Sequence, residues 1–274
     1  MCDTLCVRTG DAMLFAKNSD RHPAEAQIVE WHDARPAVRA LRTQYLEIPD
    51  LGASAYLGSR PTWLRGAEHG VNEHHVAIGN EKIFTVDSPR DLPPALLGMD
   101  LVRLGLERAR CADDALDVIT SLLTQYGQGG SGEPFTDEPY FSSFLIADPE
   151  AGWVIETSNR TWVARPAGDG CAISNRVSLR TDWTRSSPTL RPALISTRSD
   201  SFACQRRSLI TGSPSPAQPR AAVPRRRRPT SRRHCAHTEV RGTTVACRAR
   251  RVTTGRASRC ACTGPSSTRR RQQE

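Results

Sequence analysis

The charge of this chain changes sign near residue 190, and that break limits how much of the chain can fold around one core. Residues 1–190 hold 18 Lys and Arg against 26 Asp and Glu, whereas residues 191–274 hold 20 Arg, no Lys and three acidic residues. No aromatic residue follows Phe202. A segment so charged and so poor in large apolar side chains cannot offset the conformational entropy lost on folding. We therefore expect a folded domain over residues 1–187 and an Arg/Pro-rich tail of little order over residues 188–274.

Three interpretations of this tail remain open. It has the composition of an arginine-rich arm for nucleic acid or of a nuclear address, and also that of a plain solvated tail. The third interpretation is translation out of frame, because a chain with only two lysines, Lys17 and Lys82, suggests a GC-rich gene. We expect a frameshift between Pro188 and Pro224. The lack of aromatic side chains to stack on bases argues against a nucleic-acid partner.

The first 187 residues have the pattern of strands, then a helix pair, then strands. Alternating or continuous apolar runs predict strands, and apolar residues at helical spacing predict helices. This order favours an α+β fold in which antiparallel sheets pack face to face and helices cover them. The strands are expected at Thr4–Val7, Met13–Lys17, Ala26–Trp31, His75–Asn80, Ser143–Asp148, Trp153–Thr157, Thr161–Arg165 and Ala172–Ser174, and the helices after Leu96 and between Asp113 and Gly127.

A cysteine stands directly behind the initiator methionine. A small residue at position 2 normally allows Met1 to be removed, which would leave Cys2 with a thiol and a free α-amino group. A thiol titrates near pH 8.5 and an α-amino group at about 7.7–8.0, so the neutral amine can take the thiol's proton near neutral pH. The alternative is that Cys2 is an ordinary small residue that opens a strand.

Other polar residues are expected to gather near this cysteine. The predicted hairpin returns the chain beside its own start, which brings Lys17, Asn18 and Asp20 towards Cys2. Two more predicted strands end on Asn80 and Asn175. An Asn amide is a suitable oxyanion donor, although an Asn at a strand end is more often a turn residue.

Eight segments in order carry a resemblance to a known family: MCDTLCV, FAKNSDR, EAQIVEW, WLRGAEHGVNEHHVAIGNE, LLGMDLVRLGLERA, ALDVITSLLTQYGQGG, SFLIADPEAGWVIET and AISNRVS. Together they resemble the secernin and dipeptidase family of cysteine peptidases. These are N-terminal nucleophile hydrolases, related to choloylglycine hydrolases and penicillin V acylases. The resemblance runs from Met1 to about Asp182 and then fades, and CAHTEVRGTTVA (Cys235–Ala246) is similar to a later segment of the family.

The resemblance implies a four-layer αββα sandwich, incomplete at the C-terminus of this chain. It implies that Cys2 is the nucleophile and, through its amine, the base, and that Asp20 orients the amine. Lys17 stands where related acylases have an arginine near the thiol. Asn80 and Asn175 are the implied oxyanion and substrate donors.

The implied function is a cysteine-type dipeptidase or amide hydrolase that acts on short peptides without a cofactor. Two alternatives remain: a non-catalytic, secernin-like interaction protein on the same fold, and an inactive, truncated copy. The dense run from Glu68 to His75 has no closed metal-ligand spacing, so no metal is expected. With no apolar run long enough to span a membrane and no signal peptide, we expect a cytoplasmic protein without a membrane partner. A homo-oligomer is compatible with the sequence.

Overall fold

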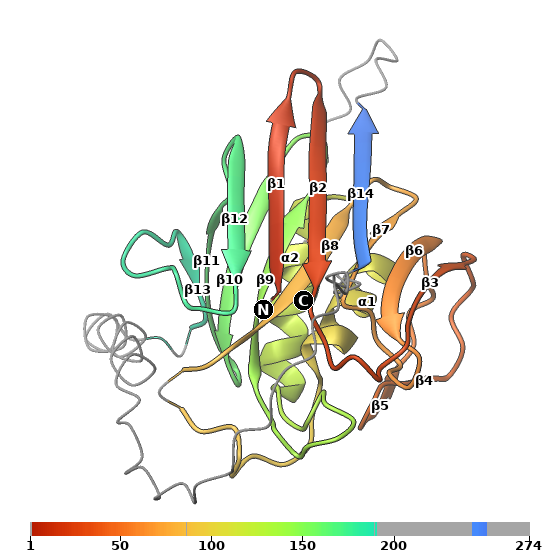
Figure 1. Ribbon diagram of the computed structural model, residues 1–274, viewed down its shortest axis with the longest axis vertical. Coiled ribbons are helices and arrows are strands. Elements are labelled where there is room, and N and C mark those ends of the chain that lie inside the picture. The colour runs from red at the N-terminus through yellow and green to blue at the C-terminus, as the bar shows by residue number, and fades with distance from the viewer. Residues whose placement is uncertain (1, 86, 189, 191–242, 251–274) are drawn as a thin grey trace, which may run out of the picture.

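The computed structural model describes residues 2–85, 87–188, 190 and 243–250 (Figure 1). Two β-sheets lie one on the other, and two helices cover the far face of the larger sheet. Among the described residues this gives three layers in the order sheet, sheet, helices. The folded part follows from the apolar patterning, since the buried side chains come from the two facing sheets and from one face of each helix.

The smaller sheet has the order β12-β1-β2-β14 and is antiparallel throughout. Its first two strands form the hairpin that the sequence predicts, with Gly10 in the turn at a φ of +61°, a conformation that glycine adopts without strain. Thr4 lies opposite Lys17, and Asp3 lies opposite Ser174. The bounds are β1 (Asp3–Thr9), β2 (Ala12–Ser19), β12 (Gly170–Ser174) and β14 (Thr243–Arg250).

The larger sheet has eight antiparallel strands in the order β13-β11-β10-β9-β8-β7-β6-β3. A separate two-stranded sheet pairs β4 with β5. The bounds are β3 (Gln27–His32), β4 (Ala40–Arg42), β5 (Glu47–Pro49), β6 (Tyr56–Pro61), β7 (His69–Asn72), β8 (Ala77–Ile83), β9 (Phe141–Ala147), β10 (Gly152–Ser158), β11 (Thr161–Pro166) and β13 (Arg185–Ser186).

The helices α1 (Gly98–Arg108) and α2 (Ala112–Tyr126) pack on the larger sheet, against β7 and β8 and against β9 and β10 respectively. Asp100 caps the first turn of α1 by accepting the backbone N–H of Leu97 at 2.9 Å. The main apolar core lies between these helices and the sheet. Its fully buried members include Ile78, Leu101, Leu104, Leu116, Ile119, Phe144, Ile146 and Ile155.

Every element predicted from the sequence is present, with ends that shift by a few residues. Three expectations need comment. The short strands β4, β5, β6, β7 and β13 were not predicted, and β14 lies in a tail for which no regular pattern was expected. The fourth layer of the implied αββα sandwich is not among the described residues and stays a prediction. The rest of the tail lies outside the described residues.

Candidate active site

Cys2 lies at the start of β1, and the β1–β2 hairpin brings the residue after β2 beside its thiol. The backbone N–H of Asp20 donates to the Sγ atom of Cys2 at 3.3 Å, and Sγ lies 3.6 Å from the backbone oxygen of Asp20. The predicted proximity of these two residues is therefore confirmed. The contact runs through the backbone of Asp20, and a donated N–H favours the thiolate form of the sulfur.

The backbone nitrogen of Cys2 is held by a different residue from the one expected. It donates to the Oδ1 atom of Asn175 at 2.7 Å, while the Nδ2 atom of Asn175 donates to the backbone oxygen of Lys82 at 3.0 Å. Asn175 directly follows β12, which pairs with β1, so the sheet register places it at the start of β1. Asn175 thus has the orienting contact that the resemblance implied for Asp20.

Lys17 lies in a buried cluster at the same end of the hairpin. Its Nζ atom donates to the backbone oxygen of Asn80 at 2.7 Å and to Oε1 of Glu81 at 2.9 Å. The Thr4 hydroxyl donates to the same carboxylate oxygen. Lys17 and Glu81 are 2% and 1% exposed, so water does not screen this ion pair. The cluster joins β1 and β2 of the smaller sheet to β8 of the larger one.

The structure does not bring the side chain of Asn80 to the thiol. Successive side chains of a strand point to opposite faces of its sheet. Glu81 faces the smaller sheet, so Asn80 faces the helices, and its Nδ2 atom donates to Sδ of Met99 on α1 at 3.5 Å. Four of the five predicted site residues lie together at this end of the hairpin: Cys2, Lys17, Asp20 and Asn175. Asn80 takes part only through its backbone oxygen, which accepts from Lys17.

The thiol of Cys2 is not a ready-made thiolate. Burial raises its pKa above the ordinary value, and the ammonium of Lys17 and the N–H of Asp20 offset only part of that effect. The carboxylates of Glu81 and Glu68 add to the increase. Because a cysteine attacks as the thiolate, a reaction at neutral pH needs a base close to this sulfur.

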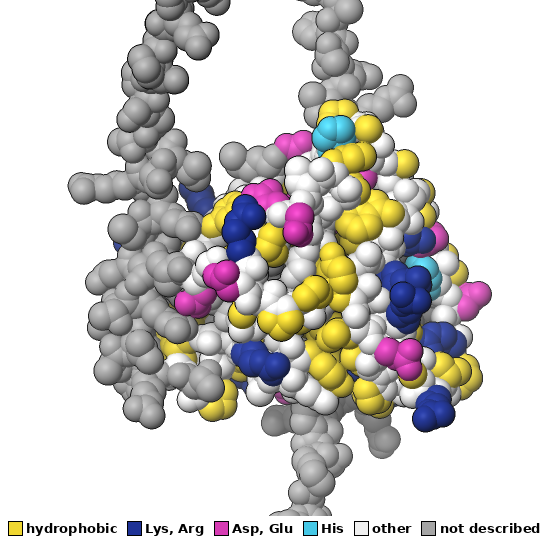
Figure 2. Space-filling model, turned by 90° about the horizontal axis from the view of Figure 1, so that it is seen from below, with side chains coloured by type: hydrophobic (Ala, Val, Ile, Leu, Met, Phe, Trp, Pro, Cys, Tyr) yellow, Lys and Arg dark blue, Asp and Glu magenta, His cyan; other side chains and the backbone are white. Residues whose placement is uncertain are grey.

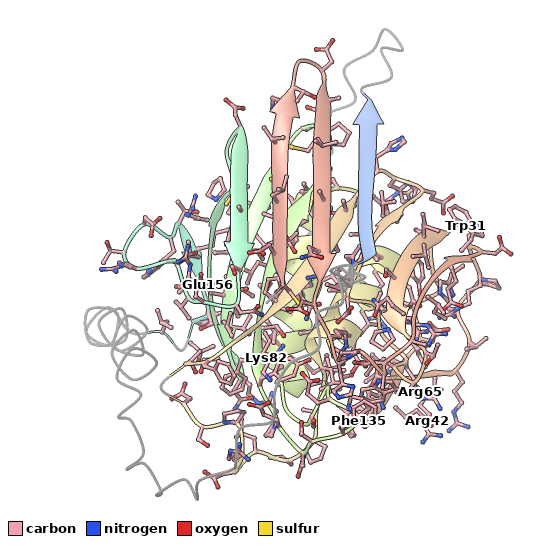
Figure 3. The ribbon with its side chains drawn as sticks, viewed as in Figure 1. Trp31, Arg42, Arg65, Lys82, Phe135 and Glu156 are labelled. Atoms are coloured by element: carbon pink, nitrogen blue, oxygen red, sulfur yellow. The ribbon has the colours of Figure 1, made fainter. Side chains whose placement is uncertain are left out.

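Two cations, Arg21 and Lys82, bind the loop that contains Gly132 and Glu138, and Lys82 is labelled in Figure 3. Arg21 donates to the backbone oxygen of Gly132 at 2.7 Å and pairs with Glu68 at 3.0 Å. Lys82 pairs with Glu138 at 2.8 Å. Arg21 directly follows the predicted site residue Asp20, and Lys82 lies two residues after Asn80. This closeness in sequence is the signal that could have pointed to them. Seen from below relative to Figure 1, apolar side chains lie between groups of both charges on the surface (Figure 2).

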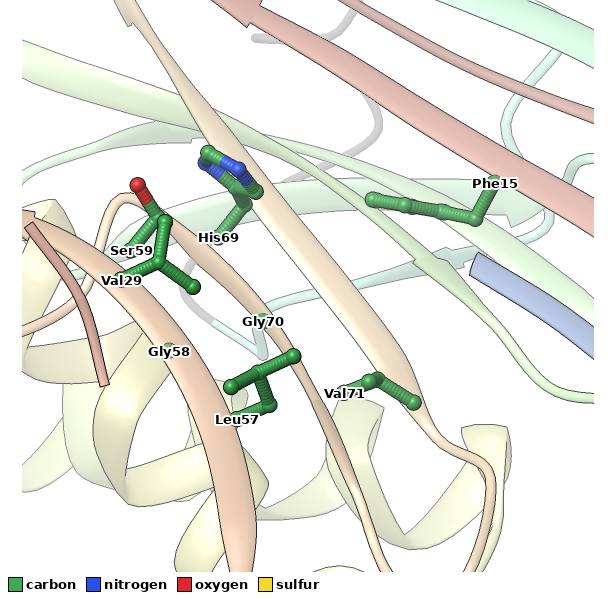
Figure 4. Close-up of a pocket in the computed structure, with 8 residues that line it drawn as sticks. All are labelled: Phe15, Val29, Leu57, Gly58, Ser59, His69, Gly70 and Val71. Atoms are coloured by element: carbon green, nitrogen blue, oxygen red, sulfur yellow. The ribbon is translucent and has the colours of Figure 1, made fainter. Parts of the chain in front are cut away.

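A small apolar pocket with a cavity volume of about 10 Å³ lies between β2 of the smaller sheet and the strands β3, β6 and β7 of the larger one (Figure 4). Phe15, Leu57 and Val71 line it together with His69, which is 1% exposed. Neither ring nitrogen of His69 has a hydrogen-bond partner among the described residues. Burial lowers the pKa of His69 to about 3, so its ring is neutral. No group of three His, Cys, Asp or Glu side chains in the described ranges is arranged to hold a metal ion.

No protein-family model matches the chain. The solved structures that resemble it include the following three, each at low identity. A mutant of the conjugated bile acid hydrolase from Clostridium perfringens is 13% identical, with a TM-score of 0.49, over 65% of this chain and 54% of the other. The penicillin V acylase from Agrobacterium tumefaciens is 11% identical, with a TM-score of 0.42, over 61% of this chain and 49% of the other.

The third is the Caenorhabditis elegans ortholog of N-acylethanolamine-hydrolyzing acid amidase, 11% identical with a TM-score of 0.43, over 64% of this chain and 70% of the other. The chain spans about half the length of the bile acid hydrolase and of the acylase. Similarity this low does not define a function, so the functional assignment depends on the geometry around Cys2. None of the described helices is both long and apolar enough to cross a membrane.

Proposed function

We propose that this chain is a cysteine-type amide hydrolase whose nucleophile is Cys2 and whose base is the α-amino group of the same residue. One observation carries the proposal: the backbone nitrogen and the sulfur of Cys2 both make hydrogen bonds within one site. Its nitrogen lies 2.7 Å from Oδ1 of Asn175, and its sulfur accepts the N–H of Asp20. A cysteine that merely opens a strand does not need this arrangement.

The proposed reaction begins after Met1, which lies outside the described residues, has been removed. The free amine of Cys2 takes the thiol's proton, and the thiolate attacks the carbonyl carbon of the amide. The ammonium then gives that proton to the leaving amine, and a thioester forms on Sγ. Water, activated by the same amine, hydrolyses the thioester and releases the acid.

Asn175 has two tasks in this mechanism. Its Oδ1 atom orients the amine so that the lone pair points towards the sulfur. Its Nδ2 atom carries two N–H groups, of which one goes to Lys82, and the second is our candidate oxyanion donor. The Asn80 side chain has no part in this scheme, because it points to the helix layer.

The buried thiol explains why the amine is needed. Burial raises the pKa of Cys2, so the thiolate fraction at neutral pH is small without a base. An amine on the same residue removes the proton at the moment of attack, and the proton then remains available for the leaving group. Short peptides, and dipeptides in particular, are the proposed substrates, and this choice rests on the sequence resemblance alone.

The proposal is tested by incubating the full chain with a panel of dipeptides and N-acyl amides and measuring the amine released. We expect hydrolysis of at least one substrate by the unmodified chain and none by Cys2→Ala. Cys6→Ala is the matched control, since Cys6 lies on the same strand, is buried in the core and should not affect hydrolysis. Equal activity in the unmodified chain and in Cys2→Ala would exclude Cys2 as the nucleophile.

The same panel separates the proposal from a non-catalytic interaction protein on this fold. An interaction protein would retain Met1 and hydrolyse no member of the panel. It would also tolerate Cys2→Ser without a change in its binding partners.

A further inference from the structure

We propose that Glu81 is a positioning residue for Cys2: it balances the charge of Lys17 near the thiol and holds the two sheets in register at that point. This inference rests on the proposed function, because it concerns the same nucleophile. It adds a residue that neither the spacing of motifs nor the resemblance singled out.

The contacts of Glu81 are unusually one-sided. Its Oε1 atom accepts both the Lys17 ammonium, at 2.9 Å, and the Thr4 hydroxyl. Its Oε2 atom is buried and has no hydrogen-bond partner among the described residues. A carboxylate that served only to join the sheets would be expected to satisfy both oxygens, since an unsatisfied buried acceptor is destabilising.

The sheet geometry connects this cluster to Cys2. Thr4 is two residues after Cys2, so both side chains point to the same face of the smaller sheet. Lys17 lies directly opposite Thr4. Glu81 comes from the facing sheet and contacts both of them, which places the carboxylate between the sheets, beside Thr4, which is two residues along the chain from the nucleophile.

Three charged groups act on the thiol from the elements around it. They are Lys17 on β2, Glu68 just before β7 and Glu81 on β8. Lys17 lowers the pKa of Cys2, whereas Glu81 and Glu68 raise it. Removing the charge of Glu81 would leave the ammonium of Lys17 uncompensated, and the thiolate would then form at lower pH.

Stability alone does not account for an ion pair at this place. Taking two charges out of water carries a large desolvation penalty, and well-packed apolar residues of similar volume often give equal or greater stability. A charge pair near a nucleophile has a functional explanation instead, because it sets the local potential at the sulfur. The Lys17 ammonium also binds the backbone oxygen of Asn80, which ties the middle of β8 to β2.

The test is the pH dependence of Cys2 alkylation by iodoacetamide, measured by peptide mass spectrometry on the full chain. Three variants are compared with the unmodified chain: Lys17→Met, Glu81→Gln and the double variant. We expect the pH at which Cys2 alkylation is half-maximal, the midpoint, to rise by about one unit in Lys17→Met and to fall by about one unit in Glu81→Gln. The midpoint of the double variant should lie close to that of the unmodified chain.

An unchanged or raised midpoint in folded Glu81→Gln would overturn the proposal. If circular dichroism shows that this variant does not fold, the double variant decides: the same raised midpoint as Lys17→Met would mean that Glu81 contributes nothing. Glu107→Gln is the matched control, because Glu107 is a similarly buried carboxylate, paired with Arg103 at 2.7 Å, on the helix α1 that covers the far face of the larger sheet. Its midpoint should equal that of the unmodified chain.

This measurement is independent of hydrolysis. Shifted midpoints in a chain that hydrolyses nothing would contradict the proposed function and leave the role of Glu81 intact. Hydrolysis by a chain whose alkylation midpoint does not shift in the variants would support the proposed function and contradict the role of Glu81.

Discussion

At the scale of single residues, the site is defined by what holds the nitrogen and the sulfur of Cys2. Asn175 accepts from the nitrogen, and the backbone of Asp20 donates to the sulfur. Both contacts come from residues at strand ends, where the backbone leaves the sheet and a short side chain can reach the neighbouring strand. The amide of Asn175 is therefore the side chain whose loss should affect the chemistry most.

We predict that Asn175→Ala lowers kcat/KM of any hydrolysis by about 100-fold, the size of effect seen when one oxyanion donor is removed. It loses both the contact to the Cys2 nitrogen and the proposed oxyanion donor. The control is Asn18→Ala, because Asn18 is exposed on β2 and near the same hairpin. Steady-state kinetics on the best substrate of the panel gives the comparison, and similar losses in both variants would contradict the role of Asn175.

At the scale of elements, β10 fixes the segment that follows β12 and Asn175. Oε1 of Glu156 accepts the N–H of Ser178 at 2.6 Å and its hydroxyl at 2.8 Å, and Oε2 accepts the N–H of Leu179 at 3.1 Å. Burial nevertheless raises the pKa of Glu156 from 4.5 to about 7. The folded chain therefore holds a proton on this carboxyl at pH values where the unfolded chain has lost it.

This raised pKa predicts that stability falls as the pH rises from about 4.5 to 7, because the folded state binds more protons than the unfolded state over that window. The contribution of Glu156 is up to about 3 kcal/mol. Glu156→Gln should remove it, so that the difference in unfolding free energy between the two chains grows with pH. Urea unfolding at pH 5, 6, 7 and 8 measures this, and a difference that does not vary with pH would contradict it.

The hairpin, the helix pair and the later meander could be predicted because each has a clear period and a turn signal, such as Gly10 or Gly127. β6 and β7 could not, because YLGSRP and HGVN are short and contain glycine or proline. The gathering of Lys17 and Asp20 near Cys2 followed from the hairpin. The direction of Asn80 was not predicted, because the expected strand stopped at Asn80, whereas β8 continues to Ile83 and turns the Asn80 side chain to the helix layer.

At the scale of the whole molecule, the smaller sheet is completed at one edge by a strand from far along the chain. β14 pairs with β2 over its whole length, from Thr243 opposite Ser19 to Arg250 opposite Ala12. It lies partly within Cys235–Ala246, the isolated segment that resembles the family. The outer face of this sheet leaves Leu5 and Val7 exposed at 40% and 37%, which is where a fourth layer would lie.

We predict that a chain ending at residue 242 loses protection along β2. Backbone N–H groups of β2 that point to β14 would be left without their partners and would exchange with solvent faster. Hydrogen exchange read by mass spectrometry, on the full chain and on the shortened one, gives the comparison. The strands β9 and β10 in the middle of the larger sheet serve as the internal control, and equal exchange along β2 in both chains would contradict the pairing.

The frameshift between Pro188 and Pro224 stays a prediction. Sequencing of the coding DNA tests it: a second reading frame over this region should continue with strand and helix patterns. If the other frames show no such patterns, the hypothesis is wrong.

The central claim is that Cys2 becomes an N-terminal nucleophile with its own amine as base. The most direct measurement is peptide mapping by mass spectrometry after a brief, limiting dose of a thiol alkylator. We predict that Met1 is absent and that Cys2 labels much faster than Cys6, which is buried, and Cys111, which is partly buried. If Met1 is retained, or if all three cysteines label at the same rate, the nucleophile is not assembled and the account is contradicted.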